Sequence, residues 1–169
     1  MAVLNPDHLL EQADRLITPP GGGAPRQADL RRAISNAYYA LFHTVVAEAA
    51  DSLVGRTHRT SSRYQLVYRS IDHRSLRVLC EDSVKSTLPA KYTRYAPKAG
   101  FGADLIALAT AVVELQEKRH LADYDPLYAV RMSDALLAIS TSRNALDRFR
   151  SANRAWRKTF VTLLMFAPR

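Results

Sequence analysis

The feature that most constrains the fold is the stretch from residue 27 to residue 54, which contains neither glycine nor proline. Large apolar residues recur in it three or four positions apart, as on one face of an α-helix: Leu30, Ile34, Tyr38, Leu41 and Val45. An adjacent strip holds the small residues Ala33, Ala37, Ala40 and Thr44. Because small residues let a neighbouring helix approach closely, the stretch predicts the central helix of a bundle. Gly55 is placed to end it.

Further segments also have helical periodicity. They cover residues 5–17, a segment capped by Thr60 or Ser61, residues 103–124, a helix starting at Asp125-Pro126, and an apolar tail. The short corner at 124–126 predicts an antiparallel hairpin. The run 72–75 is compatible with either a turn or a continued helix. We therefore expect an all-α, antiparallel bundle of four to six helices. It forms a single domain over residues 1–169, with a flexible Pro/Gly connector at 18–25 and a basic loop at 85–102.

Cysteine usage and hydropathy bear on the cellular compartment. Cys80 is the single cysteine, so no internal disulfide can form. The N-terminal segment has charged residues among its apolar ones and does not resemble a secretory signal. The apolar stretch 160–167 is too short to span a bilayer. These features predict a cytoplasmic protein without membrane contact.

Positive charge is concentrated near the C-terminus. The net charge is +8, and residues 131–169 contribute eight Lys or Arg against two Asp, or +6. Such asymmetry is typical of proteins with polyanionic partners, but it also describes a solvated arginine-rich helix face. Aromatic residues at 149, 156 and 160 alternate with a basic set that we predict to bind RNA: Arg150, Arg154, Arg157 and Lys158. The alternative is an amphipathic helix whose aromatic side chains pack inward.

Arg119 continues an apolar stripe, because it follows Leu115 by four residues. Asp123 lies a further four residues on and can pair with it on the same helix face. Tyr124 adds a hydroxyl at the same helix end. One interpretation is a structural ion pair that holds the corner at 124–126. The other is an anion-binding arginine that Asp123 holds ready.

Two motifs carry a resemblance to a known family. Residues 119–125, with Arg119, Ala122, Asp123 and Tyr124, resemble the Arg-x-x-Ala-Asp-Tyr signature of HEPN-domain proteins. Residues 32–43, which contain Ala-Tyr-Tyr-Ala at 37–40, are similar to an early helix of that family. The similarity spans roughly residues 28–150.

This resemblance implies a helical bundle that dimerises and acts on RNA. Many members are metal-independent endoribonucleases, in which an arginine holds the phosphate and a histidine acts as general acid or base. The product expected is a 2′,3′-cyclic phosphate. Members also act as toxins or defence components, so an antitoxin-like protein partner is implied as well as RNA. The residues that the resemblance and helix geometry place as catalytic candidates are Arg69, His73, Arg119, His120, Asp123 and Tyr124.

The spacing of arginine and histidine leaves two functions open. The family pair has four to six residues between Arg and His, and no pair in this chain has that spacing. Arg119 and His120 are adjacent, and so point about 100° apart on a helix. Arg69 and His73 would share a face of a continuous helix. The chain is therefore either a nuclease with an altered pair or a catalytically silent helical dimerisation or interaction module.

Other site classes are not indicated by the sequence. The five histidines lack metal-ligand spacing, and no phosphate-binding glycine loop is present, so we expect neither a metal nor a cofactor. His43 is interpreted as a packed helix residue and Cys80 as a core thiol. The small-residue strip of 33–44 and the apolar tail 160–166 together predict a homodimer, because one small bundle need not bury both.

Overall fold

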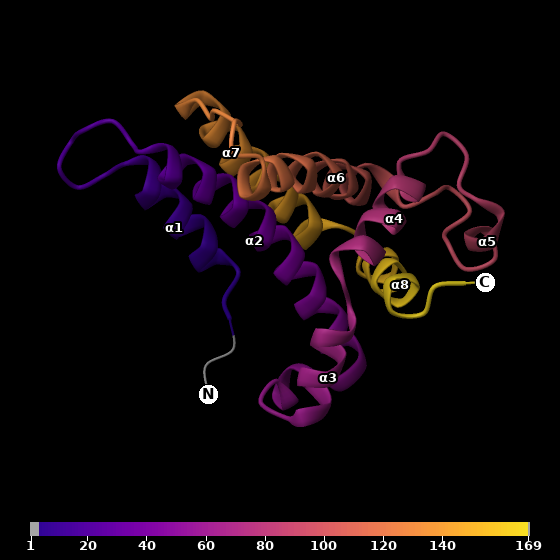
Figure 1. Cartoon of the computed structure of the whole chain (residues 1–169). Helices are drawn as coiled ribbons and strands as arrows, with labels where there is room; N and C mark the ends of the chain where they lie inside the picture. The colour runs from indigo at the N-terminus through magenta and orange to yellow at the C-terminus, as the bar shows by residue number, and fades with distance from the viewer. Residues whose placement is uncertain (1–3, 169) are drawn as a thin grey trace.

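The computed structural model describes residues 4–168 and confirms an all-α fold (Figure 1). This part of the chain forms eight α-helices and a 3-10 turn, more than the four to six helices expected. Their bounds are α1 Asp7–Ile17, α2 Gln27–Val54, η1 Arg56–His58, α3 Ser62–Ser70, α4 His73–Ser83, α5 Ala90–Thr93, α6 Gly102–Tyr124, α7 Met132–Ser151 and α8 Arg154–Met165. The excess arises from the one-turn α5 inside the basic loop and from the division of 62–83 into two helices.

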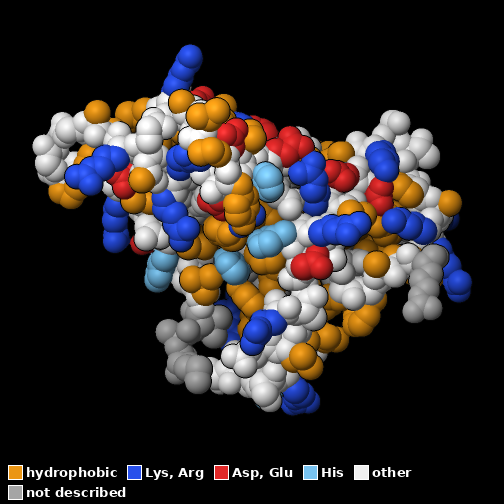
Figure 2. Space-filling model, viewed as in Figure 1, with side chains coloured by type: hydrophobic (Ala, Val, Ile, Leu, Met, Phe, Trp, Pro, Cys, Tyr) orange, Lys and Arg blue, Asp and Glu red, His pale blue; other side chains and the backbone are white. Residues whose placement is uncertain are grey.

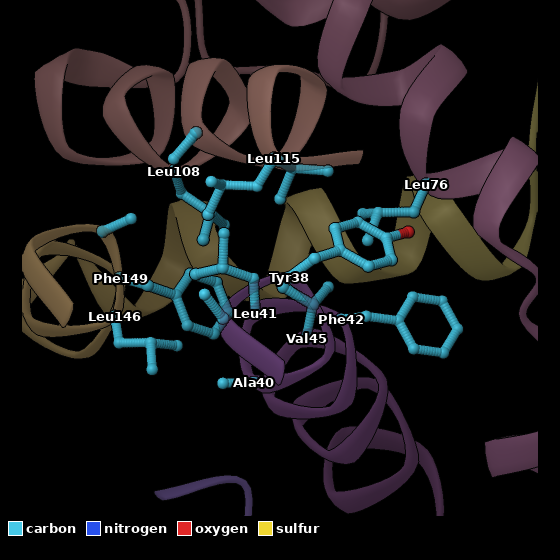
Figure 3. Packing of buried hydrophobic residues seen from close by; sticks show 14 of the residues in the cluster. Tyr38, Ala40, Leu41, Phe42, Val45, Leu76, Leu108, Leu115, Leu146 and Phe149 are labelled. Atoms are coloured by element: carbon cyan, nitrogen blue, oxygen red, sulfur yellow. The ribbon is translucent and has the colours of Figure 1, made fainter. Parts of the chain in front are cut away.

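The long helix α2 is the centre of the bundle, as its sequence predicts. It packs against α1, α3, α6, α7 and α8. Ala33, Ala37 and Ala40 are fully buried, so the small-residue strip is used for helix packing within one chain. Figure 3 shows Tyr38 and Leu41 of α2 beneath helix α6, with the α7 residue Phe149 beside Leu41. Gly55 ends α2 at φ 99°, a conformation that favours glycine.

A break in the chain at Ile71–Asp72 separates α3 from α4. The Ser61 hydroxyl accepts the Tyr64 N–H and caps α3. The Asp72 carboxylate accepts the Ser75 N–H and caps α4. The run 72–75 is therefore a new helix start. The expectation that Arg69 and His73 share one helix face is wrong, because the two residues lie on different helices.

The corner between α6 and α7 differs from its prediction. Asp125 and Pro126 do not begin a helix, since α7 starts at Met132. The Asp125 carboxylate instead accepts the N–H of Leu127, two residues on, which is a turn rather than a helix cap. The Gln27 side chain exchanges two hydrogen bonds with the backbone of Val130, at 2.8 and 2.9 Å. The hairpin itself is present, with α6 packed against α7.

The C-terminal tail forms α8, capped by Asn153. Phe149 and Phe160 are buried, as the inward-packing interpretation of the aromatic residues requires. Leu163 and Leu164 are buried too, whereas Phe166 at the end of the apolar tail is 60% exposed, so most but not all of the tail packs within the single chain. No helix in the described range 4–168 is long and apolar enough to cross a membrane.

Gly102 provides a test of the packing at the start of α6. Its φ is +74°, and a Cβ atom there would lie 2.5 Å from Cζ3 of Trp156. We expect Gly102→Ala to destabilise the protein by about 2–4 kcal/mol, because backbone strain adds to overpacking. Gly100 is the matched control, since its φ is +77° but a Cβ there meets nothing within 4 Å. Urea unfolding of both variants measures the difference, and equal losses would contradict the clash.

Candidate histidine–arginine site

Two polar contacts join α2 to the C-terminal half of α6. The Ser35 hydroxyl donates to Asp123 Oδ1 at 2.5 Å. One turn along α2, the Tyr39 hydroxyl accepts a hydrogen bond from Arg119 Nη2 at 2.6 Å. Arg119 and Asp123 also pair with each other, with Nε 2.7 Å from Oδ2. Because the Arg119 side chain is only 14% exposed, the guanidinium is held at a defined position rather than free in solvent.

His73, the first residue of α4, lies against the same part of α2. Its Nδ1 is 2.8 Å from the Tyr38 hydroxyl. Its ring centroid is 4.0 Å from that of Phe42 and 5.9 Å from that of Tyr39. Tyr39 therefore contacts both Arg119 and His73, which come from different helices. Nε2 is then the other ring nitrogen, and it can accept a proton in the tautomer in which Nδ1–H donates to the Tyr38 hydroxyl.

His43 extends this arrangement by one more turn of α2. Its ring stacks between Tyr39 and Tyr68, with centroid distances of 6.0 and 5.9 Å. Its Nδ1 lies 2.8 Å from the Tyr68 hydroxyl. We call the set Tyr38, Tyr39, His43, His73 and Arg119 the histidine–arginine cluster. Figure 2 shows histidine side chains near the middle of the viewed face, with hydrophobic side chains exposed between them and Lys and Arg around them.

Burial and neighbouring charge favour the neutral form of both imidazoles. Burial lowers the pKa of His73, and the positive charge of Arg119 lowers it further, against a smaller opposite effect of Asp72. Burial also lowers the pKa of His43, with a contribution from His73. Burial opposes the charge of Arg119, but the Tyr39 hydrogen bond and Asp123 outweigh it and raise the pKa of Arg119. The cluster thus combines a fixed cation with neutral imidazoles that can accept a proton.

These directions predict how stability depends on pH. Below about pH 6.5 the unfolded chain protonates its histidines, whereas folded His43 and His73, whose pKa values are lowered, take up protons only at lower pH. The unfolded state then binds more protons, so the free energy of unfolding should fall as pH drops below about 6.5. His43 and His73 should not change the free energy of unfolding between pH 7 and 8. Urea titrations should show a smaller acid loss in the double variant His43→Gln/His73→Gln, and an unchanged loss would contradict this origin.

The remaining predicted catalytic residues lie at the edge of the cluster or outside it. Tyr124 is 63% exposed, and the Arg119 guanidinium carbon lies 5.4 Å from its ring centroid. His120 is exposed, and its ring packs against that of Tyr124, with the two centroids 5.0 Å apart. Arg69 is exposed on α3. The structure therefore brings Arg119, Asp123 and His73 together, with Tyr124 and His120 beside them and Arg69 elsewhere.

The four basic residues predicted to bind RNA have different environments. Arg157 is 18% exposed and pairs with Glu48 at 2.8 Å, while its Nη1 donates to the backbone carbonyls of Phe149 and Arg150. Arg150 pairs with Asp7 at 2.5 Å. Arg154 and Lys158 are exposed on α8. Arg157 thus stabilises the junction of α7 and α8, whereas Arg154 and Lys158 face solvent.

Sequence reasoning missed Tyr39 and His43 as members of the site, and it missed the role of Arg31. Ser35, Tyr39 and His43 are spaced four residues apart, so a polar row on the α2 face was a signal that could have found them. Arg31 donates from Nε to the Ala122 carbonyl at 2.6 Å, and from Nη2 to the carbonyls of Leu121 and Asp125. Arg31 thereby provides hydrogen-bond donors for the backbone carbonyl groups at the C-terminal end of α6, next to Asp123.

Comparisons with protein-family models, with curated proteins and with solved structures found no match to this chain. Among residues 4–168, no group of three or more His, Cys, Asp or Glu side chains is arranged to hold a metal ion. Cys80 is fully buried, and burial raises the pKa of its thiol. The side chains that the structure gathers at the site carry imidazole, phenol, guanidinium and carboxylate groups.

Proposed function

We propose that the protein is an RNA-directed, HEPN-like protein whose histidine–arginine cluster cleaves RNA without a metal ion. The observation that carries this proposal is the contact of Tyr39 with both Arg119 and His73. It places a charged guanidinium near a neutral imidazole although the two residues are 46 positions apart in the sequence (119 minus 73). An arginine can bind a phosphate through two parallel hydrogen bonds, and a neutral imidazole can accept a proton.

The reaction that suits these groups is an internal transesterification. His73 Nε2 accepts the proton of a ribose 2′-hydroxyl, and the 2′-oxygen attacks the adjacent phosphorus. The bond between phosphorus and the 5′-oxygen breaks, and the leaving oxygen takes up a proton from a second acid or from water. Arg119 neutralises the charge that develops on the phosphoryl oxygens. The products are a 2′,3′-cyclic phosphate and a 5′-hydroxyl end.

A catalytically silent interaction module is the second candidate, and one observation favours it. Arg119 already has an anionic partner in Asp123 and an acceptor in Tyr39. A phosphate would have to share the guanidinium with both. In such a module the same contacts would hold α2, α4 and α6 together and would not turn over a substrate.

The test is RNA cleavage by the purified protein in the presence of EDTA. We expect a labelled oligoribonucleotide to yield fragments that end in a 2′,3′-cyclic phosphate. A matched oligonucleotide with a single ribose should be cut only after that ribose, because the other positions lack the 2′-hydroxyl. Absence of cleavage, or cleavage at deoxyribose positions, would overturn the proposed reaction. Absence of any cleavage would favour the interaction module.

The homodimer, the antitoxin-like partner and the cytoplasmic location remain predictions of this proposal. A second copy would need an apolar surface, and the exposed large apolar side chains near the α6–α7 corner provide one: Leu121, Tyr124, Leu127, Met132 and Leu137. Tyr124 belongs to this set and also contacts Arg119. A partner bound at the corner would therefore lie next to the histidine–arginine cluster.

A further inference from the structure

A second polar surface lies apart from the histidine–arginine cluster, in a groove of about 890 Å³. One wall is the C-terminal half of α2 with the turn that follows it, and another is the junction of α7 and α8. The segment 4–7 closes one side. The groove is lined by six basic side chains, which come from regions about 100 residues apart: Arg56, Arg59, Arg150, Arg154, Arg157 and Lys158.

The carboxylates of the groove are already neutralised by neighbouring arginines. Asp51 pairs with Arg59 at 2.5 Å and with Arg56 at 3.4 Å. Glu48 pairs with Arg157, and Asp7 pairs with Arg150. Six basic groups against these three acidic ones leave a formal charge of +3. The groove thus has a net positive charge, and each of its carboxylates is paired with an arginine.

Two of these three net charges lie on the α8 wall, and the third lies where Arg56 and Arg59 share the single carboxylate of Asp51. Within residues 4–168, neither Arg154 nor Lys158 takes part in an ion pair, and both are exposed. They are four residues apart on α8, which places them about 6 Å apart along one helix face. This separation is comparable to that of adjacent phosphates in an extended single strand. Two consecutive phosphates could therefore contact the two side chains together.

We propose that this groove binds the phosphodiester backbone of single-stranded RNA, independently of base sequence. The inference rests on the proposed function for the choice of RNA. Phe149, the aromatic residue in the lining, is buried, so the groove offers no exposed ring on which a base could stack. A protein partner would be expected to need an apolar centre, whereas charged and polar side chains dominate this lining. The missing aromatic platform argues against recognition of bases, and the charged lining argues for contact with the phosphodiester backbone.

The test compares two double charge reversals in a His73→Gln background, which prevents cleavage during the binding measurement. The groove variant is Arg154→Glu/Lys158→Glu. Arg154 is the first residue of α8, where a carboxylate is favourable, so this variant should fold. The control is Arg94→Glu/Lys98→Glu in the loop 85–102, which has the same change of charge outside the groove. Binding of a fluorescent 12-nucleotide oligouridylate is followed by anisotropy between 50 and 200 mM KCl.

We expect the groove variant to bind about tenfold or more weakly at low salt. Its plot of log affinity against log salt should be less steep by about 1.4, since a single strand contributes roughly 0.7 for each phosphate contact. The control should retain the parent slope. An oligodeoxyuridylate of equal length should bind the parent within a few-fold, because the backbone is recognised. Equal losses in both variants, an unchanged groove variant, or equally effective competition by oligoglutamate would overturn the proposal.

This experiment separates the groove from the proposed reaction. If the native chain binds RNA through the groove but does not cleave it, the groove proposal holds and the nuclease proposal fails. If the native chain cleaves RNA, if Arg154→Glu/Lys158→Glu made in the native background cleaves it at the same rate, and if the groove variant binds as tightly as its parent, the nuclease proposal holds and the groove proposal fails.

Discussion

Replacement of His73 by glutamine is expected to lower the rate of RNA cleavage by about 10²–10⁴-fold, the usual contribution of a general acid or base. The melting temperature should change little by comparison. Glutamine can keep the hydrogen bond to the Tyr38 hydroxyl that Nδ1 makes at 2.8 Å, but it cannot accept a proton near neutral pH. Single-turnover cleavage in EDTA, measured beside thermal unfolding, separates loss of chemistry from loss of fold.

The control for this prediction is His8→Gln, because His8 is exposed on α1. It should cleave at the native rate. If His73→Gln also cleaves at that rate, His73 is not the base, and the exposed His120 becomes the histidine to replace. If His73→Gln loses activity and structure together, the role of His73 is to hold α4 against α2.

Arg119→Ala should destabilise the protein by about 2–3 kcal/mol, between the small cost of breaking an exposed ion pair and the 3–5 kcal/mol of a buried one. The Arg119 side chain is 14% exposed and that of Asp123 24%, so the pair lies between these cases. The loss also includes the hydrogen bond to Tyr39. For a chain of this size the melting temperature should fall by roughly 4–12 °C.

Arg69→Ala is the matched control, since Arg69 is exposed and its replacement should change stability by less than about 0.5 kcal/mol. Arg119→Lys then distinguishes the two candidate functions. A lysine keeps the charge beside Asp123 but lacks the planar fork that holds a phosphate. The nuclease proposal expects a folded, inactive Arg119→Lys protein. Equal melting temperatures for Arg119→Ala and Arg69→Ala would show that the ion pair contributes little to stability.

Local signals were enough to predict much of the fold. The periodicity of residues 27–54 predicted α2, and Gly55 correctly predicted where α2 ends. The polar residues Ser61 and Asp72 are N-caps, although for Asp72 a continued helix was equally compatible with the sequence. Asp125-Pro126 was misread because an aspartate before proline can start a helix or make a turn. Here the Gln27 side chain binds the Val130 backbone and helps to hold the turn, a contact over 103 residues that no local pattern contains.

The site was also predicted only in part, because local patterns reveal contacts within a helix but not contacts between helices. Arg119 and Asp123 lie on one helix, so their pairing follows from spacing of four residues. The approach of His73 to Tyr38 depends on the chain break at 71–72 and on the packing of α4, neither of which the spacing to Arg69 reveals. His43 is the packed helix residue that the sequence predicted, but its packing between Tyr39 and Tyr68 beside the site depends on the position of α3, which no local pattern reveals.

The unbroken helix α2 forms a wall of both surfaces, with Tyr39 and His43 at the cluster and Glu48 and Asp51 at the groove. Over the nine residues from Tyr39 to Glu48, a helix rises by about 14 Å. A flexible hinge would let this offset vary, whereas a single helix keeps it constant. If both proposals hold, the offset along α2 sets the distance between the position where an RNA strand is bound and the position where it is cut. Cleavage of a strand bound in the groove would then give fragments with a narrow range of lengths.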